Sequence, residues 1–213
     1  MDAASIAPCA SAKQPGSWRR SSRAATSVPG VLTDDSSSVT LALPFAVRYF
    51  GQTMTHYAVS SNGFAQLFAN SSGVSSTGSF NSTMPTAGSP NGVVAPFWDD
   101  LEPPAAGTAN VRTLTTGAMG SRVFTIQWTN WRTYNTATPQ VGQTLTFQAQ
   151  IAEGSNQVEF HYCNMTPATA GGTSHTGLSA TIGLENATGT VASLQSFNTT
   201  GAVMTGSGFR FTP

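Results

Sequence analysis

Three carboxylates near the middle of the chain, Asp99, Asp100 and Glu102, are the first residues whose types and spacing suggest chemistry. Such groups can act as acid and base in a glycosidase, and with the Asn62 carbonyl they can supply hard oxygen ligands for Ca²⁺. Neighbours on a strand point to opposite faces, so Asp99 and Asp100 share a site only within a turn. Because the spacing matches no calcium loop, we favour carboxylates that cap turn amides after a buried Phe97-Trp98 pair. We therefore predict no cofactor, with Ca²⁺ as the alternative.

Nucleophilic catalysis has little support in the sequence. The chain has three histidines, and no Gly-x-Ser-x-Gly motif presents a serine as a nucleophile. His161 and Cys163 lie two residues apart in a predicted strand, where they share one face and can form a Cys–His pair. A surface histidine next to a disulfide is the commoner arrangement. The sequence therefore predicts no catalytic residues and a protein that is not an enzyme.

The two cysteines, Cys9 and Cys163, show neither a Cys-x-x-Cys motif nor a metal-binding spacing. One interpretation is two unrelated thiols. The other is a disulfide that fastens the N-terminal segment to the domain, either within one chain or between two chains. We predict the disulfide, because the composition is typical of an extracellular protein and Cys163 faces outward in its strand.

Aromatic side chains offer a small binding platform. Trp98 and Trp128 have the phase of core residues in their predicted strands. Trp131 and Tyr134 remain as an exposed aromatic pair, on which a sugar ring can stack. These two residues are the predicted ligand-binding site of a carbohydrate-binding module.

The composition excludes several function classes. Only 8% of the 213 residues are charged and the net charge is zero, which argues against nucleic acid, because that binding requires a surplus of Lys and Arg. The longest uncharged apolar stretches are far shorter than the roughly 20 residues of a membrane helix. Residues Met1–Arg23 lack the apolar region of a signal peptide, so a leader is expected to be absent or already removed. With 39% hydrophobic residues, the chain is predicted to be a folded, secreted or cell-surface protein.

The chain divides into two parts. Residues 1–38 are rich in Ala and Ser, lack apolar periodicity and are predicted to form an N-terminal extension. From residue 39 to residue 213, apolar and polar residues alternate with the period of half-buried strands. Ser61-Asn62-Gly63 and Glu153–Asn156 are hairpin turn signals between such runs. We predict an all-β fold, an antiparallel β-sandwich of jelly-roll type, with an extended N-terminal segment. The expected core residues are Phe45, Val47, Phe124, Ile126, Trp128, Phe147, Ile151, Phe160 and Ile182.

Several of these segments, taken in order, are similar to those of a known family. Val59-Ser60-Ser61-Asn62-Gly63-Phe64, then Val94-Ala95-Pro96-Phe97-Trp98-Asp99-Asp100-Leu101, then Phe124–Trp128 and Thr146–Glu153, resemble the nidogen-type extracellular domain. The resemblance covers about residues 39–186. It implies an extracellular domain of matrix, adhesion or secreted bacterial proteins, in a family that is not known for enzymes.

Two functions remain after a hydrolase is disfavoured. The first is a structural or adhesive protein that self-associates, as a filament or matrix subunit, or binds other extracellular proteins. The second is a carbohydrate-binding module for glycans. For the first, the extension can add as a strand to a sheet edge of a neighbouring subunit. The alternative is that the extension is a tether, or that it packs on its own domain as a first strand. The residues expected to make the assembly contact are Ala24, Thr26, Val28, Val31 and Thr33.

Overall fold

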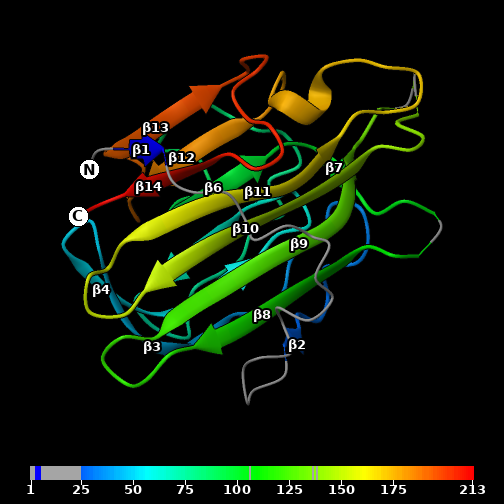
Figure 1. The fold of residues 1–213 in the computed structure, drawn as a ribbon. Coiled ribbons are helices and arrows are strands. Elements are labelled where there is room, and N and C mark those ends of the chain that lie inside the picture. The colour runs from blue at the N-terminus through cyan, green and yellow to red at the C-terminus, as the bar shows by residue number, and fades with distance from the viewer. Residues whose placement is uncertain (1–2, 6–24, 106, 136, 138) are drawn as a thin grey trace.

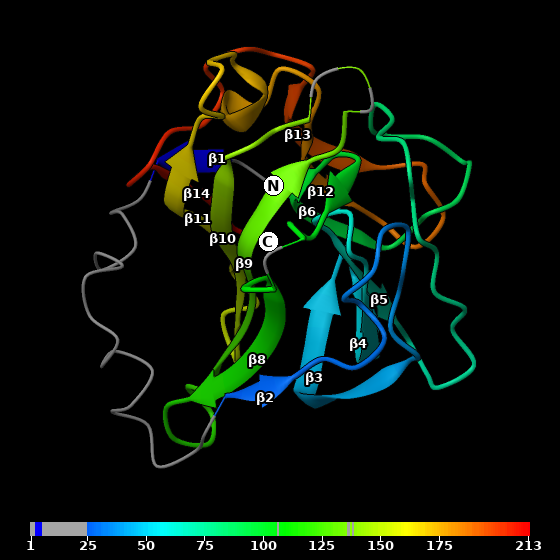
Figure 2. The same ribbon diagram turned by 90° about the vertical axis from the view of Figure 1, so that its right-hand side faces the viewer.

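The computed structural model describes residues 3–5, 25–105, 107–135, 137 and 139–213 of the chain. These residues are all-β, and their strands form two antiparallel sheets that pack face to face as a sandwich (Figure 1). The two layers are seen edge-on in Figure 2. The predicted fold class, an antiparallel β-sandwich, is therefore confirmed.

The larger sheet has eight strands. Seven of them follow one another across the sheet in the order β1 (Ala3–Ser5), β14 (Gly208–Phe211), β11 (Val158–Thr166), β10 (Thr144–Ala152), β9 (Val123–Thr133), β8 (Asn110–Thr116) and β2 (Thr26–Ser27). The eighth, β7 (Leu101–Glu102), pairs with the end of β9. Long alternating runs such as Thr144–Ala152 place their apolar residues on the inner face and their polar residues outside.

The smaller sheet has six strands. Their order is β13 (Ala192–Phe197), β12 (Thr181–Glu185), β6 (Val93–Trp98), β5 (Ala65–Phe68), β4 (Gln52–Val59) and β3 (Leu41–Tyr49). A single turn of 3-10 helix, η2 (Ser174–Thr176), lies between β11 and β12.

Several connections between strands are short hairpins, whereas the long segment 69–92 joins β5 to β6. Strands β3 to β6 are consecutive neighbours in one sheet, and β8 to β11 are consecutive neighbours in the other. Both predicted hairpins are present, since β4 pairs with β5 and β10 pairs with β11. A jelly roll needs long connections that interleave two Greek keys, whereas tight turns keep sequential strands adjacent. The connectivity consequently differs from the jelly roll that the strand spacing suggested.

The core lies between the two sheets. All nine predicted core residues are buried there and belong to one hydrophobic cluster. Phe147 stacks on Trp128 with ring centroids 5.3 Å apart, and it also contacts Phe97 of the opposite sheet at 5.6 Å. The indole N–H that Trp128 carries into the core is satisfied, because Nε1 donates to the Ser60 carbonyl at 2.9 Å.

Residues 25–38 pack on the sandwich, although their composition predicted an extension. Thr26 pairs with Thr113 of β8, and the Val28 N–H donates to the Val111 carbonyl at 2.9 Å. Val28 and Val31 are buried in the core cluster. These two side chains were expected to contact a neighbouring subunit, but they pack into the core of their own sandwich. Burying them there removes apolar surface from water without a second molecule. Thr26 and Thr33 are exposed, and Ala24 lies outside the described residues.

Candidate functional site

The turn between β4 and β5 contacts the segment that follows β6, and this contact brings the two most characteristic sequence motifs together. Asn62 is completely buried, and its side-chain oxygen accepts a hydrogen bond from the Leu101 N–H at 2.7 Å. The Asp99 N–H donates to the Asn62 carbonyl at 3.3 Å. Gly63 has a φ of +75°, and a Cβ there would lie 1.9 Å from the Phe97 carbonyl oxygen. Asn-Gly is therefore required by the close approach of two backbones.

An acidic cluster lies beside this contact. Asp34 and Asp35, from the segment before β3, join Asp100, and carboxylate oxygens of the three lie within 4.8 Å of one another. The Asn62 Nδ2 group donates to Asp35 Oδ1 at 2.9 Å, which ties the cluster to the buried turn. Asp34 and Asp35 are exposed and Asp100 is half-buried.

The electrostatics of the cluster disfavour its full ionisation. The pKa of Asp100 is raised to about 6, first by burial and then by repulsion from Asp34, Asp35 and Glu102. The pKa of Asp34 is also raised, first by burial and then by the Asp35 charge. Oxygen-only ligands of this kind suit a hard cation such as Ca²⁺, although exposed acidic groups are common without one. The Ca²⁺ alternative stays a prediction.

The three carboxylates singled out in the sequence do not form one site. Asp99 is buried and points away from the cluster, accepting hydrogen bonds from Ser179 Oγ at 2.7 Å and from the Asp100 N–H at 2.9 Å. Glu102 forms an ion pair with Arg132 at 2.9 Å. Only Asp100 lies in the acidic cluster, since Asp99 is bonded to Ser179 and Glu102 is paired with Arg132.

Asp34 and Asp35 were not among the predicted site residues, because residues 1–38 were predicted to form an extension. The Asp-Asp dipeptide is a turn signal that was available in the sequence. Its position next to Asp100, however, depends on how residues 25–38 fold back onto the sandwich.

The predicted aromatic platform does not form. Trp131 is completely buried, and its Nε1 donates to the Asn110 carbonyl at 3.2 Å, whereas Tyr134 is 39% exposed. The expected exposure of Trp131 is wrong because β9 has a register shift. Trp128 pairs with Phe147 and Trp131 with Leu145, so β9 holds one residue more than β10 in this stretch, and Asn130 has a φ of +57°. The extra residue reverses the alternation and turns both tryptophans inward.

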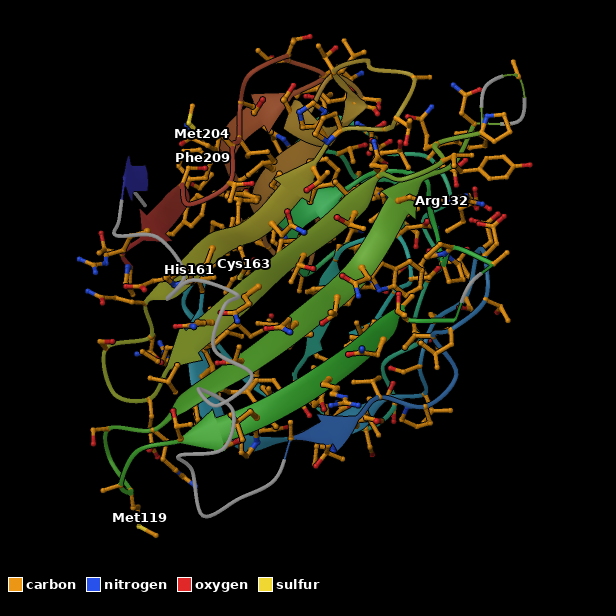
Figure 3. The ribbon with its side chains drawn as sticks, turned by 45° about the vertical axis from the view of Figure 1, so that its right-hand side comes forward. Met119, Arg132, His161, Cys163, Met204 and Phe209 are labelled. Atoms are coloured by element: carbon orange, nitrogen blue, oxygen red, sulfur yellow. The ribbon has the colours of Figure 1, made fainter. Side chains whose placement is uncertain are left out.

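His161 and Cys163 lie on the outer face of β11, as their spacing predicted (Figure 3). His161 Nε2 lies 3.2 Å from Glu159 Oε2, and Arg210 pairs with the other oxygen of Glu159 at 2.7 Å. Cys9 lies outside the described residues, so the Cys9–Cys163 disulfide stays a prediction.

The outer strand of the smaller sheet, β13, is the clearest surface for a protein contact. It ends the order of its sheet, and Leu194 and Phe197 expose 41% and 38% of their surface. Asn81 Nδ2 donates to Asn198 Oδ1 at 2.8 Å, which brings the loop that carries the 81% exposed Phe80 to the end of β13. Apolar side chains thus gather along a strand that, within the described residues, ends its sheet.

Comparison with known proteins yields a match to a family. The sequence profile of the NIDO-related family matches residues 10–212, which is nearly the whole chain. The comparisons with curated proteins and with solved structures find no match. Within the described ranges, no helix has both the length and the apolar character needed to cross a membrane.

Proposed function

Since the chain belongs to the NIDO-related family, we propose that it is a non-catalytic structural or adhesive protein of the extracellular space that self-associates through the edge of β13. The family suggests an extracellular domain and is not a known enzyme family. The observation that supports the proposal is that β13 ends its sheet within the described residues, exposes Leu194 and Phe197, and has neither the proline nor the charged side chain that would protect an edge against strand pairing.

The other sheet edges in the described part of the chain have such protection. The larger sheet ends in β1 and β2, which have three and two residues and are too short to pair extensively. At the far edge of the smaller sheet, β3 contains Pro44, which lacks an N–H, and Arg48, and its pairing with β4 is interrupted between Ala42 and Val47.

By contrast, β13 has six residues without proline or charge. Its pairing with β12 is irregular only between Ser196 and Leu194, where Gln195 is the extra residue. No Asp, Glu, Lys or Arg occurs between Glu185 and Arg210 in the sequence. A second copy that pairs antiparallel to β13 would therefore bring no like charges together, and two-fold symmetry would place the same apolar side chains on both partners.

The experiment compares three proteins by light scattering over a range of concentrations. The parent chain should exceed its monomer mass of 22.1 kDa as the concentration rises. The double variant Leu194→Lys/Phe197→Lys should stay monomeric, because edge lysines oppose strand pairing. Met119→Lys is the matched control: Met119 is 87% exposed at the tip of the β8–β9 hairpin, away from β13 (Figure 3). Its mass should follow that of the parent.

Two results would overturn this proposal. One is a parent chain that is monomeric at every concentration, and the other is a double variant that assembles like the parent. A truncated chain that starts at residue 25 tests whether assembly depends on β13 or on the N-terminal extension. Assembly through β13 should persist in it, whereas loss of assembly would assign the contact to the extension.

A further inference from the structure

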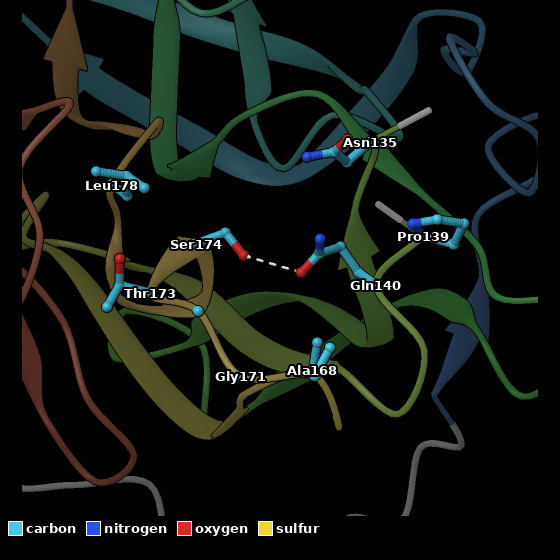
Figure 4. A pocket seen from close by; sticks show the side chains of 10 residues that line it. Asn135, Pro139, Gln140, Ala168, Gly171, Thr173, Ser174 and Leu178 are labelled. Atoms are coloured by element: carbon cyan, nitrogen blue, oxygen red, sulfur yellow. Dashed lines mark hydrogen bonds between the residues drawn. The ribbon is translucent and has the colours of Figure 1, made fainter. Parts of the chain in front are cut away.

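Two surface regions of the sandwich differ in what they offer to a further contact. One is a pocket of about 350 Å³ beside η2. Figure 4 shows Ser174 facing Gln140 there, and Ser174 Oγ donates to Gln140 Oε1 at 3.3 Å while it accepts from Gln143 Nε2 at 2.8 Å. These polar groups are partnered within the protein. The other region is the outer face of the larger sheet, where side chains that point outward are buried.

The burial on this outer face is clearest at Leu114. The pairing of β8 with β9 places Leu114 beside Thr125, on the face opposite the core residue Ile126. Leu114 is nevertheless only 8% exposed and Thr125 only 7%, and Leu114 belongs to neither hydrophobic cluster formed by the described residues. Leu194 of the edge strand β13, by comparison, is 41% exposed. The low exposure of an outward-facing leucine indicates that a further part of the protein contacts this face.

The strand order shows which part of the chain is available for this contact. β1 pairs with β14 at one edge of the larger sheet, and β2 pairs with β8 at the opposite edge (Figure 1). Adjacent strands lie about 4.8 Å apart, so the path from β1 to β2 across the sheet spans roughly 29 Å. Residues 6–24 connect the two strands and reach about 65 Å at full extension. They are long enough to cross the outer face, whereas buried side chains fill the space between the sheets.

The direction of β1 leads the chain toward Cys163. Ser5 lies opposite Phe209 of β14, and Phe209 lies opposite Phe160 of β11, so β1 and β11 run in the same direction. Cys163 is three residues beyond Phe160 and two strands from β1, which places it about 14 Å from Ser5. Cys9 is four residues beyond Ser5, and four residues reach about 14 Å. Cys9 can therefore meet Cys163 without a second molecule.

We propose that residues 6–24 lie across the outer face of the larger sheet of the same molecule, fastened to β11 by the Cys9–Cys163 disulfide. Forming this bond removes one hydrogen from each thiol, and the two electrons pass to an external disulfide such as oxidised glutathione, which is reduced to two thiols. The segment covers Leu114 and Thr125 between the two edges of the sheet. Because β13 belongs to the other sheet, this contact is independent of the proposed self-association.

The first test asks whether both cysteines of the disulfide come from one chain. Full chains labelled with ¹⁵N and unlabelled full chains are mixed in equal amounts while denatured and reduced, then refolded with oxidised glutathione and digested without reduction. Mass spectrometry should find linked Cys9–Cys163 peptides that carry one isotope only. Linked peptides of mixed label in the statistical proportion would assign the segment to a neighbouring copy and overturn the proposal, and so would two free thiols.

The second test locates the segment by NMR. A nitroxide is attached at Ser17→Cys in the oxidised, ¹⁵N-labelled full chain, where the native cysteines are paired. The amide signals of Gln127 and Gln148, on the outer face of the larger sheet, should lose most of their intensity, and those of β4 should keep theirs. A nitroxide at Val74→Cys is the matched control, because Val74 is 84% exposed in the segment that follows β5 in the smaller sheet, and it should spare Gln127 and Gln148. Unchanged Gln127 and Gln148 signals with the label at residue 17 would refute the proposal.

Discussion

The side-chain oxygen of Asn62 accepts a hydrogen bond of 2.7 Å from the backbone N–H of Leu101, 39 residues further along the chain. The same amide donates through Nδ2 to Asp35 Oδ1 at 2.9 Å and to the Thr77 carbonyl at 3.2 Å. One buried side chain thus joins the β4–β5 turn to three other segments. It also explains why the Asn-Gly motif and the Phe-Trp-Asp-Asp motif occur together in this sequence.

Replacing Asn62 with Ala should destabilise the protein by about 2–3 kcal/mol, because the Leu101 N–H would remain buried without a partner. Urea unfolding measures this change. Asn62→Asp keeps the acceptor for Leu101 but places a carboxylate oxygen against Asp35. It should therefore lose more stability at pH 7 than at pH 3, where protonation of the introduced carboxyl group removes the repulsion. Equal losses at the two pH values would contradict the contact with Asp35.

Gly63 and Gly51 form a matched pair for testing the close approach of the two motifs. Their φ angles are +75° and +78°, but a Cβ at Gly63 would collide with the Phe97 carbonyl, whereas a Cβ at Gly51 has no neighbour within 4 Å. Gly51→Ala should cost about 1–2 kcal/mol for the left-handed backbone alone. Gly63→Ala should exceed about 4 kcal/mol or prevent folding. Similar melting temperatures for the two variants would show that the backbones do not approach this closely.

Trp128→Ala tests the packing between the sheets. The indole is fully buried, stacks on Phe147 and donates to the Ser60 carbonyl, so its loss should cost about 3–5 kcal/mol. Tyr134→Ala, at a 39% exposed position after the same strand, should change stability by no more than about 0.5 kcal/mol. A Trp128→Ala protein that melts within a degree or two of the parent would contradict the assigned strand phase.

Stability should fall as the pH rises from about 4 to about 6. Burial raises the pKa of Asp99 from 3.8 to about 6, so the folded state holds this proton more tightly than the unfolded state. Ionisation of Asp99 therefore costs stability, by at most about 3 kcal/mol at about 1.4 kcal/mol per pH unit. In Asp99→Asn the slope of unfolding free energy against pH should be smaller, with a residual slope from Asp100, whose pKa is also raised to about 6. A variant with the parent's slope would show that Asp99 is not the group responsible.

The Cys9–Cys163 disulfide is tested by thiol titration under denaturing, non-reducing conditions. We expect no free thiol, and non-reducing electrophoresis should distinguish a pair within one chain from dimers or ladders formed between chains. Cys163→Ser should release one titratable thiol, at Cys9. Two free thiols in the parent would exclude the disulfide.

The strands and the sandwich could be predicted from the alternation of apolar and polar residues, because a period of two reports directly which face of each strand is buried. The nine expected core residues, the two hairpins and the family resemblance all followed from local patterns of this kind. Trp131 marks the limit of that reasoning. One extra residue in β9 reverses the alternation, and no local signal announces a bulge that is set by pairing with β10.

Local patterns could not predict which distant residues share a surface, because that depends on how the chain folds. The acidic cluster exists because residues 25–38 fold back and bury Val28 and Val31, which carries Asp34 and Asp35 to Asp100. Asp99, the residue before Asp100, instead accepts a hydrogen bond from Ser179. The exposed edge of β13 likewise depends on the order of strands in the sheet. Strand order and loop contacts are non-local, since they arise from how whole apolar faces pack together rather than from the residues on either side.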